Sequence, residues 1–215
     1  MAARTVVRIV PEMMNDTAIF TCREVQWELY IEPAVLSRFA EQRQLTPHAP
    51  EVSGQLFATF EKYRVRITHA TGPREADRRS RCLFVPNRRL ENREIKQRFG
   101  AGVHFIGDWH THPEPRPTPS SLDIASMADC FSKSQHTLTH FIMIIVGQRE
   151  GLAGLWVSLH DAKRYIRMQP AAWSSLSTPR DAEREILEGA NTTSVKPRFG
   201  ALKKVIGFTN RTKPD

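Results

Sequence analysis

The chain has 215 residues, of which 40% are hydrophobic and 25% charged, ordinary proportions for a soluble protein with one sizeable core. It contains neither a run of 18 apolar residues nor the apolar segment of a signal peptide, so we expect no membrane span and a cytoplasmic location. Its three cysteines lack a Cys-x-x-Cys pair, which favours reduced thiols over a disulfide framework.

The positive charge is concentrated in two segments. The net charge is +8, and residues 61–98 hold twelve Lys and Arg against five Asp and Glu. Residues 195–215 hold six basic residues against one acidic residue. Such patches commonly meet nucleic acid or an acidic protein, although an arginine-rich solvated face has the same composition.

Hydrophobic periodicity predicts strands interspersed with helices. In chain order, the expected strands are residues 6–10, 24–31, 51–60, 63–68, 82–85, 103–109, 140–147, 151–159 and 163–168. The expected helices are residues 33–44, 88–99 and 124–131. Residues 72–81 are charged and without periodicity, which predicts a loop. The apolar run at 140–147 is typical of a central strand buried on both faces, so the chain is expected to be an α/β protein.

The composition changes after residue 170, where a Ser/Thr/Pro-rich stretch and then a basic, weakly patterned tail follow. A short charged helix is expected at residues 181–190. We therefore expect three parts: an N-terminal extension at 1–24, one domain at 25–168, and a basic C-terminal extension at 169–215.

Two histidines, His110 and His112, lie one residue apart at the end of an apolar segment. On a strand they point the same way and lie about 6.6 Å apart along the chain, so both imidazoles can reach one metal ion. Asp123, in the first turn of the next predicted helix, can supply an oxygen ligand. Three protein ligands and one open position are typical of a catalytic zinc site.

Each piece also has an ordinary structural explanation. A lone His-x-His at a strand end is frequently incidental, and a serine followed three residues later by a carboxylate, as in Ser120 and Asp123, serves as a helix cap. The combination is more specific: His-x-His-Pro, six residues, Ser, two residues and Asp. It resembles the JAMM motif of the JAB/MPN metallopeptidases, and Glu51 to Leu56 matches the Glu-x-x-Gly-x-Leu pattern upstream of that motif.

This resemblance, which covers roughly residues 25–168, implies a single MPN/JAB-like domain with a central mixed sheet flanked by helices. It implies Zn²⁺ bound by His110, His112 and Asp123, with Glu51 as general base and Ser120 as donor to the oxyanion of the tetrahedral intermediate. Every position of the motif is filled, whereas a domain that had lost catalysis would lack one or more of these residues.

Four further residues are of types that could orient a ligand, bind a metal or act as a nucleophile. Asp108 faces the same side as His110 on the expected strand and is a candidate for orienting an imidazole. His136 and His140 are four apart, but their surroundings predict a helix end and a strand entry rather than a helical ligand pair. Cys130 lies in a helical apolar pattern, which favours a place in the core over the role of a nucleophile.

Within the JAB/MPN family, the stretch from Gly107 to Glu114 and the Pro-x-Pro-Ser that ends at Ser120 resemble a bacterial branch. Its members are deubiquitinase-like peptidases encoded beside E1- and E2-like enzymes in antiphage operons, CBASS systems among them. The resemblance implies cleavage after the C-terminal tail of a conjugated protein, either a cyclic-nucleotide synthase or a ubiquitin-like modifier. Isopeptidase is the first interpretation, and an endopeptidase that matures a ubiquitin-like precursor is the alternative within the class.

From other classes, a basic nucleic-acid-binding module with a vestigial metal site, or an MPN-type scaffold, would also fit parts of the sequence. No stacking-aromatic platform or nucleic-acid reading motif accompanies the charge, which ranks the first below a peptidase. The filled motif argues against the scaffold.

The Arg-rich stretch from Arg74 to Arg98 is expected to flank the cleft of the zinc site and to hold an acidic partner.

Overall fold

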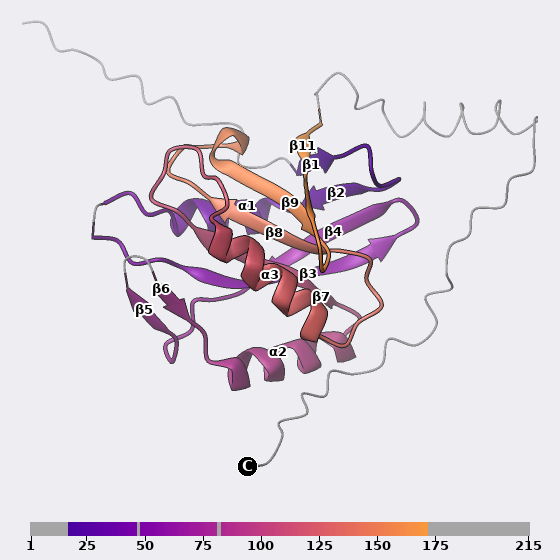
Figure 1. Cartoon of the computed structure of the whole chain (residues 1–215), viewed down its shortest axis with the longest axis horizontal. Coiled ribbons are helices and arrows are strands. Elements are labelled where there is room, and N and C mark those ends of the chain that lie inside the picture. Colours follow the sequence, from indigo (N-terminus) through magenta and orange to yellow (C-terminus); the bar gives the residue numbers. More distant parts are fainter. Residues whose placement is uncertain (1–16, 47, 81–82, 172–215) are drawn as a thin grey trace, which may run out of the picture.

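The computed structural model describes residues 17–46, 48–80 and 83–171, whose arrangement is shown in Figure 1. Its strands are β1 (Ala18–Thr21), β2 (Glu28–Ile31), β3 (Ser53–Glu61), β4 (Arg64–Ala70), β5 (Arg78–Ser80), β6 (Leu83–Val85), β7 (His104–Thr111), β8 (Phe141–Val146), β9 (Leu155–His160), β10 (Tyr165–Arg167) and β11 (Gln169–Pro170). Its helices are α1 (Pro33–Glu41), α2 (Arg88–Gly100) and α3 (Ser121–Lys133), with a 3-10 turn, η2 (Leu152–Gly154).

Nine of these strands form one mixed sheet, in the order β10-β9-β8-β7-β3-β4-β2-β1-β11. The pairs β2/β4 and β7/β8 are parallel and the others antiparallel. Strands β5 and β6 pair only with each other, as a separate hairpin. The expected α/β class, with a central mixed sheet flanked by helices, is confirmed.

The two edge strands of the large sheet are neighbours in the chain. Only Met168 separates β10 from β11, and β11 pairs with β1 at the far edge. Met168 is buried, and its N–H donates to the carbonyl of Val157 on β9 at 2.9 Å. The sheet therefore curls back toward itself, which leaves it fewer exposed edges than an open sheet would have.

The sheet is covered on both faces, with α3 in front of it and α1 behind it in Figure 1. Val35 and Phe39 of α1 pack into one core cluster, with residues such as Trp109. Ile95 of α2 and Met127 of α3 pack into the other. Strand β8 lies between the two clusters and all six of its side chains are buried, as its continuous apolar sequence predicts.

Local sequence explains where the helices begin. Pro33 occupies the first turn of α1, where its fixed φ and missing N–H do no harm. The side chain of Asn87 caps α2 by accepting the N–H of Leu90. Ser120 caps α3 in the same way, in a capping box completed by Asp123.

The structure departs from the sequence-based elements in a few places. The prediction of a plain loop at 72–81 is wrong, because Arg78–Ser80 forms β5. The large sheet also includes β1 and β11, which lie just outside residues 25–168. The strand expected at 6–10, the helix expected at 181–190 and the basic tail lie outside the described residues. Within the described residues, no helix is both long and apolar enough to cross a membrane.

Candidate metal centre

Strand β7 carries both histidines, and a bulge next to Gly107 sets the face they occupy. The register between β3 and β7 shifts between Leu56 and Phe57, opposite Gly107. Gly107 has a φ of 140°, and a side chain there would clash with the main chain of Ile142 on β8. After the bulge, Trp109 enters the core cluster that contains α1, while His110 points to the face covered by α3.

The second part of the centre is the N-terminus of α3. The hydroxyl and the backbone N–H of Ser120 each donate to Oδ2 of Asp123 at 2.7 Å. The N–H of Asp123 donates back to the Ser120 hydroxyl at 3.2 Å. The ordinary explanation of this serine as a helix cap is therefore correct, and the cap itself holds the Asp123 carboxylate at the head of the helix.

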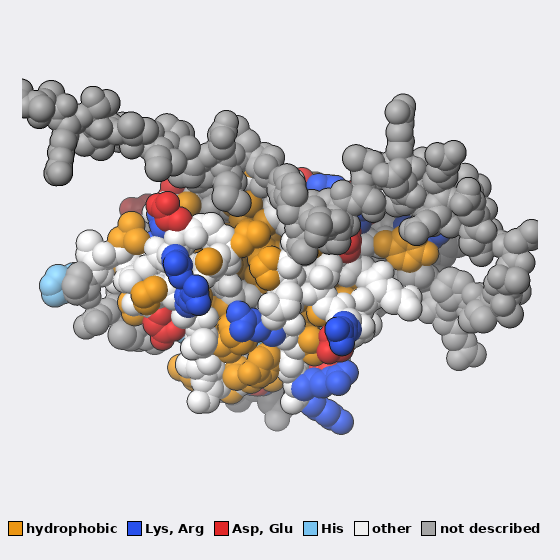
Figure 2. Space-filling view, turned by 90° about the horizontal axis from the view of Figure 1, so that it is seen from above, with side chains coloured by type: hydrophobic (Ala, Val, Ile, Leu, Met, Phe, Trp, Pro, Cys, Tyr) orange, Lys and Arg blue, Asp and Glu red, His pale blue; other side chains and the backbone are white. Residues whose placement is uncertain are grey.

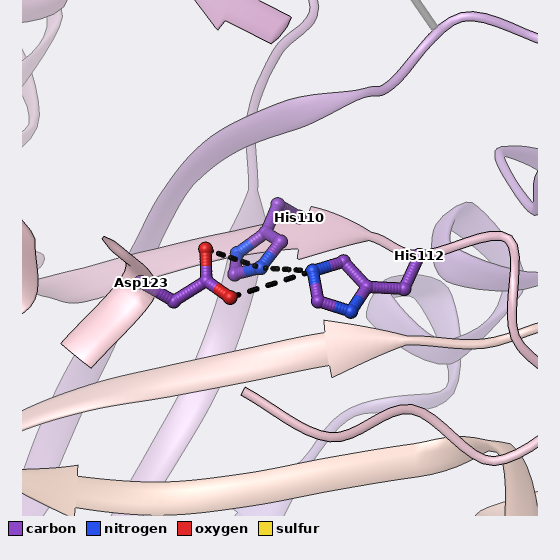
Figure 3. Close-up of side chains that lie close together, drawn as sticks. All are labelled: His110, His112 and Asp123. Carbon is purple, nitrogen blue, oxygen red and sulfur yellow. Dashed lines mark hydrogen bonds and ion pairs between the residues drawn. The ribbon is translucent and has the colours of Figure 1, made fainter. Parts of the chain in front are cut away.

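His110, His112 and Asp123 converge, as Figure 3 shows. The two Nε2 atoms lie 3.2 Å apart, Nε2 of His110 lies 3.4 Å from Oδ1 of Asp123, and Nε2 of His112 lies 3.5 Å from Oδ2. Ligand atoms held 2.0–2.1 Å from a tetrahedral centre lie roughly 3.4 Å from one another. Each of these distances is close to that value, so the three side chains lie where they could hold one zinc ion, with the two histidines nearest to different oxygens of the same carboxylate.

The chemistry of the three side chains also favours a bound cation. Two imidazole nitrogens that face each other at 3.2 Å repel each other unless a proton or a cation lies between them. Burial alone would raise the pKa of Asp123, but hydrogen bonds from the two histidines and from Ser120 hold its pKa well below the ordinary value. The hydrogen bond with Asp123 in turn raises the pKa of His112. The carboxylate thus stays ionised and attracts positive charge to this point.

Glu51 lies two residues before β3, and β3 is the strand that pairs with β7. The register pairs Ser53 with His110, and the N–H of Thr111 donates to the carbonyl of Val52, which brings Glu51 alongside the two histidines. Burial raises the pKa of Glu51, and the charges of His110 and His112 lower it. A carboxylate in this position is chemically able to accept and return a proton.

The glycine of the Glu-x-x-Gly pattern has a packing reason. A Cβ at Gly54 would lie 1.6 Å from the carbonyl oxygen of Thr71 and 2.8 Å from Nε1 of Trp109. The Trp109 indole donates to that same carbonyl at 2.9 Å across the glycine. The pattern thus places the segment after Glu51 in close contact with the strand that carries the histidines.

Other residues singled out from the sequence do not join the centre. Within the described residues, Asp108 makes no hydrogen bond to either histidine; it lines a cavity of about 280 Å³ between α2 and α3, and burial raises its pKa to about 7. His136 contacts the carbonyl of Phe131, and His140 contacts Thr139, so the two do not form a pair of ligands. Cys130 packs beside the core cluster that includes α2 and α3.

Sequence reasoning missed two buried polar residues behind the centre, Gln44 and Thr111. Gln44 is 1% exposed and Thr111 is not exposed at all, and the Thr111 hydroxyl donates to Oε1 of Gln44 at 3.0 Å. The position of Thr111 between the two histidines, facing the other side of the strand, was the available signal. Nothing in the sequence marks Gln44, which lies 67 residues away.

Comparison with known families decides the identity of the domain. Residues 32–158, more than half of the chain, match the family described as prokaryotic homologs of the JAB domain. This chain belongs to that family. The resemblance inferred from the JAMM spacing is thereby confirmed.

Relatives of known name extend the assignment. The chain is 30% identical over 141 residues to a CD-NTase/cGAS isopeptidase of Vibrio cholerae, covering 64% of this chain and 88% of that protein. It is 27% identical over 148 residues to an Escherichia coli protein of the same name, covering 67% of this chain and 89% of that protein. These relatives support an isopeptidase of the JAB type.

Among solved structures, protein DSY2949 from Desulfitobacterium hafniense is similar, with a TM-score of 0.44 and 19% identity. The match covers 61% of this chain and 82% of that chain.

Proposed function

We propose that the protein is a zinc-dependent isopeptidase that releases a conjugated protein by cleaving after its C-terminal tail. The observation that carries the proposal is the convergence of His110, His112 and Asp123, whose ligand atoms lie within 4.8 Å of one another, with Glu51 alongside. A zinc ion held there supplies a nucleophile from water at neutral pH and polarises the scissile carbonyl.

The protein's own side chains would carry the proton transfers. Glu51 takes the proton released as the nucleophile forms and returns it to the leaving amine. Ser120 stabilises the developing oxyanion with its single hydroxyl proton. Because that proton is donated to Asp123 in this structure, the hydroxyl must rotate when substrate is bound.

The names of the relatives suggest the substrate. We propose that the conjugated protein is a cyclic-nucleotide synthase of the CD-NTase class, because the two relatives compared above are named CD-NTase/cGAS isopeptidases. A ubiquitin-like modifier conjugated by E1- and E2-like enzymes would present the same chemistry, an extended C-terminal tail joined to an amine. An endopeptidase that matures a ubiquitin-like precursor remains the alternative use of the same centre.

Nucleic-acid binding is less well supported as the main function. On the face shown in Figure 2, Lys and Arg side chains are scattered among apolar and neutral ones rather than gathered in one patch. Two arginines of the basic segment form hydrogen bonds within the fold: Arg74 with Glu94 and Gln55, and Arg98 with Glu94. Part of the positive charge therefore stabilises the domain.

The proposal is tested by metal content and cleavage on one preparation. Elemental analysis is expected to find one zinc per chain in the wild type and little in His112→Ala, while His69→Ala, which removes an exposed histidine on β4, retains it. The wild type is expected to cleave a CD-NTase conjugate and to stop when zinc is chelated. Absence of zinc from the wild type, or full zinc in His112→Ala, would refute the proposed metal centre.

A further inference from the structure

We infer that Thr111 and Gln44 are positioning residues, which hold the main chain on either side of Glu51 in the place that proton transfer requires. The inference rests on the proposed role of Glu51 and adds to it two residues on the opposite face of β7. Its basis is a chain of hydrogen bonds that begins at Thr111, between the two histidines, and ends at Val52 and Ala49, on either side of Glu51.

Thr111 makes two hydrogen bonds to Val52, the residue after Glu51: one through its own backbone N–H and one through its hydroxyl. The backbone N–H of Thr111 donates to the carbonyl of Val52 at 2.9 Å, and the N–H of Val52 donates to the Thr111 hydroxyl at 3.0 Å. In a regular antiparallel pair the second bond would run from backbone to backbone. Here a side-chain hydroxyl replaces the carbonyl, so the path of the chain at Val52 depends on that hydroxyl.

Gln44 extends the same network to the residues before Glu51. Its Oε1 accepts the Thr111 hydroxyl at 3.0 Å, and its Nε2 donates to the carbonyl of Ala49 at 3.0 Å. The carbonyl of Gln44 accepts the side-chain amide of Gln148 at 2.8 Å, which fixes Gln44 to the turn after β8. One glutamine thus connects the strand of the histidines to the loop that delivers Glu51.

The consequence for Glu51 is that the main chain is held at three points close to it. Its own N–H donates to the carbonyl of Ser80 at 2.9 Å, while Ala49 and Val52 are held by Gln44 and Thr111. The same residue, Thr111, lies between the two candidate ligands. These bonds tie the main chain at Glu51 to the histidine strand, so they would keep Glu51 in register with the candidate ligands. A displacement of about 1 Å in an active site can lower the rate roughly 100-fold.

A purely structural role predicts a different result. Buried, satisfied polar networks also stabilise folds without any effect on chemistry. Ser158 is a matched case: it is fully buried on β9, and its hydroxyl contacts Nε1 of Trp156 at 3.1 Å and Nε2 of His160 at 2.9 Å. Loss of that hydroxyl should destabilise the domain without changing kcat.

The test compares Thr111→Val, which keeps the shape but removes the hydroxyl, with Thr111→Ser, which restores it, and with Ser158→Ala. The probe is a synthetic isopeptide in which a Gly-Gly carboxyl terminus is joined to the ε-amine of lysine. Thr111→Val is expected to lower kcat by roughly 10- to 100-fold, with KM within about twofold and zinc content unchanged. Thr111→Ser and Ser158→Ala are expected to keep kcat near the wild-type value. If Thr111→Val does not fold, Gln44→Met removes the link from its other end and is expected to lower kcat less, because the bond from Val52 to Thr111 remains.

Amide hydrogen exchange on the zinc-free protein provides a readout that does not depend on activity. Thr111→Val is expected to speed exchange at Val52, whereas Ser158→Ala leaves exchange at Val52 unchanged. Unchanged exchange at Val52, loss of zinc from Thr111→Val, or a kcat equal to that of Ser158→Ala would overturn the inference while leaving the isopeptidase intact. If instead Glu51→Ala retains full kcat, the proposed general base fails, and the positioning role fails with it.

Discussion

The hydroxyl of Ser120 donates to the carboxylate of Asp123 at 2.7 Å, so one serine both caps helix α3 and holds a candidate zinc ligand. The same hydroxyl is the proposed donor to the oxyanion. The observed structural role and the proposed catalytic role therefore fall on a single atom, and the effect of a substitution there must be separated into both.

Ser120→Ala is expected to lower the free energy of unfolding by about 1 kcal/mol through loss of the cap, and to lower kcat by roughly 10²- to 10³-fold through loss of the oxyanion donor. Chemical denaturation and steady-state cleavage of the synthetic isopeptide measure the two effects. Asn87→Ala is the matched control, because it removes the N-cap of α2 at a comparable cost in stability. An equal fall in kcat in both variants would mean that Ser120 acts only as a cap.

Glu51→Ala is expected to abolish turnover while leaving the fold and the zinc content intact, since Glu51 lies beside the three candidate ligands without being one of them. Loss of a general base typically costs about 10²- to 10⁴-fold in rate. Glu51→Gln, of the same size, should behave like Glu51→Ala. Loss of zinc from Glu51→Ala would show that Glu51 is a ligand. A normal kcat in Glu51→Ala would show that another residue is the general base.

The sequence predicted the parts of the structure that local patterns determine. The six apolar residues of β8 form a short continuous run, which favours a buried strand, and the motif spacing identified three side chains whose ligand atoms the structure brings within 4.8 Å of one another. Strand β5 was missed because its three residues are all exposed and carry no periodicity; contacts distant from the local pattern, the pairing with β6 and the hydrogen bond from Glu51 to Ser80, hold them in place. The link between Gln44 and Thr111 could not be predicted, because it joins residues far apart in the sequence through tertiary packing.

We expect the domain to lose stability in mild acid because of the buried His160. It is 1% exposed, and burial lowers its pKa from 6.5 to about 4, with Asp161 opposing the shift and His140 adding to it. Because the folded pKa lies below the unfolded one, the stability that neutral His160 contributes is fully present above pH 6.5. It is lost as the pH falls toward 4, by roughly 3 kcal/mol in all.

The measurement is the free energy of unfolding at several pH values between 7.5 and 4.5, in the presence of a chelator so that zinc does not contribute. His160→Gln removes the titrating group and keeps a side chain able to bond Ser158. The difference between wild type and variant is expected to shrink as the pH falls. Parallel curves would show that other groups cause the acid sensitivity.

We expect the arginines of the β5–β6 hairpin to dock an acidic surface of the conjugated protein. Arg78 and Arg79 are exposed, and within the described residues neither has a carboxylate partner. The next residue, Ser80, accepts the N–H of Glu51 through its carbonyl. The hairpin is therefore joined directly to the residue that would carry the chemistry, and we expect its charges to meet the conjugated protein beside the metal centre.

Charges at the rim of an interface act mainly through the association rate and its sensitivity to salt. Reversal of Arg78 and Arg79 to Glu is therefore expected to raise KM for a whole conjugate at least tenfold, and to change KM for the short isopeptide by less than about twofold. Reversal of Lys163 and Arg164, two exposed residues between β9 and β10, makes the same change in net charge outside residues 74–98 and should leave both values near wild type. The nucleic-acid alternative predicts that the wild type binds generic DNA or RNA with a steep salt dependence and cleaves no conjugate. Both assays on one preparation separate these outcomes, and binding without cleavage would overturn the isopeptidase together with its docking hairpin.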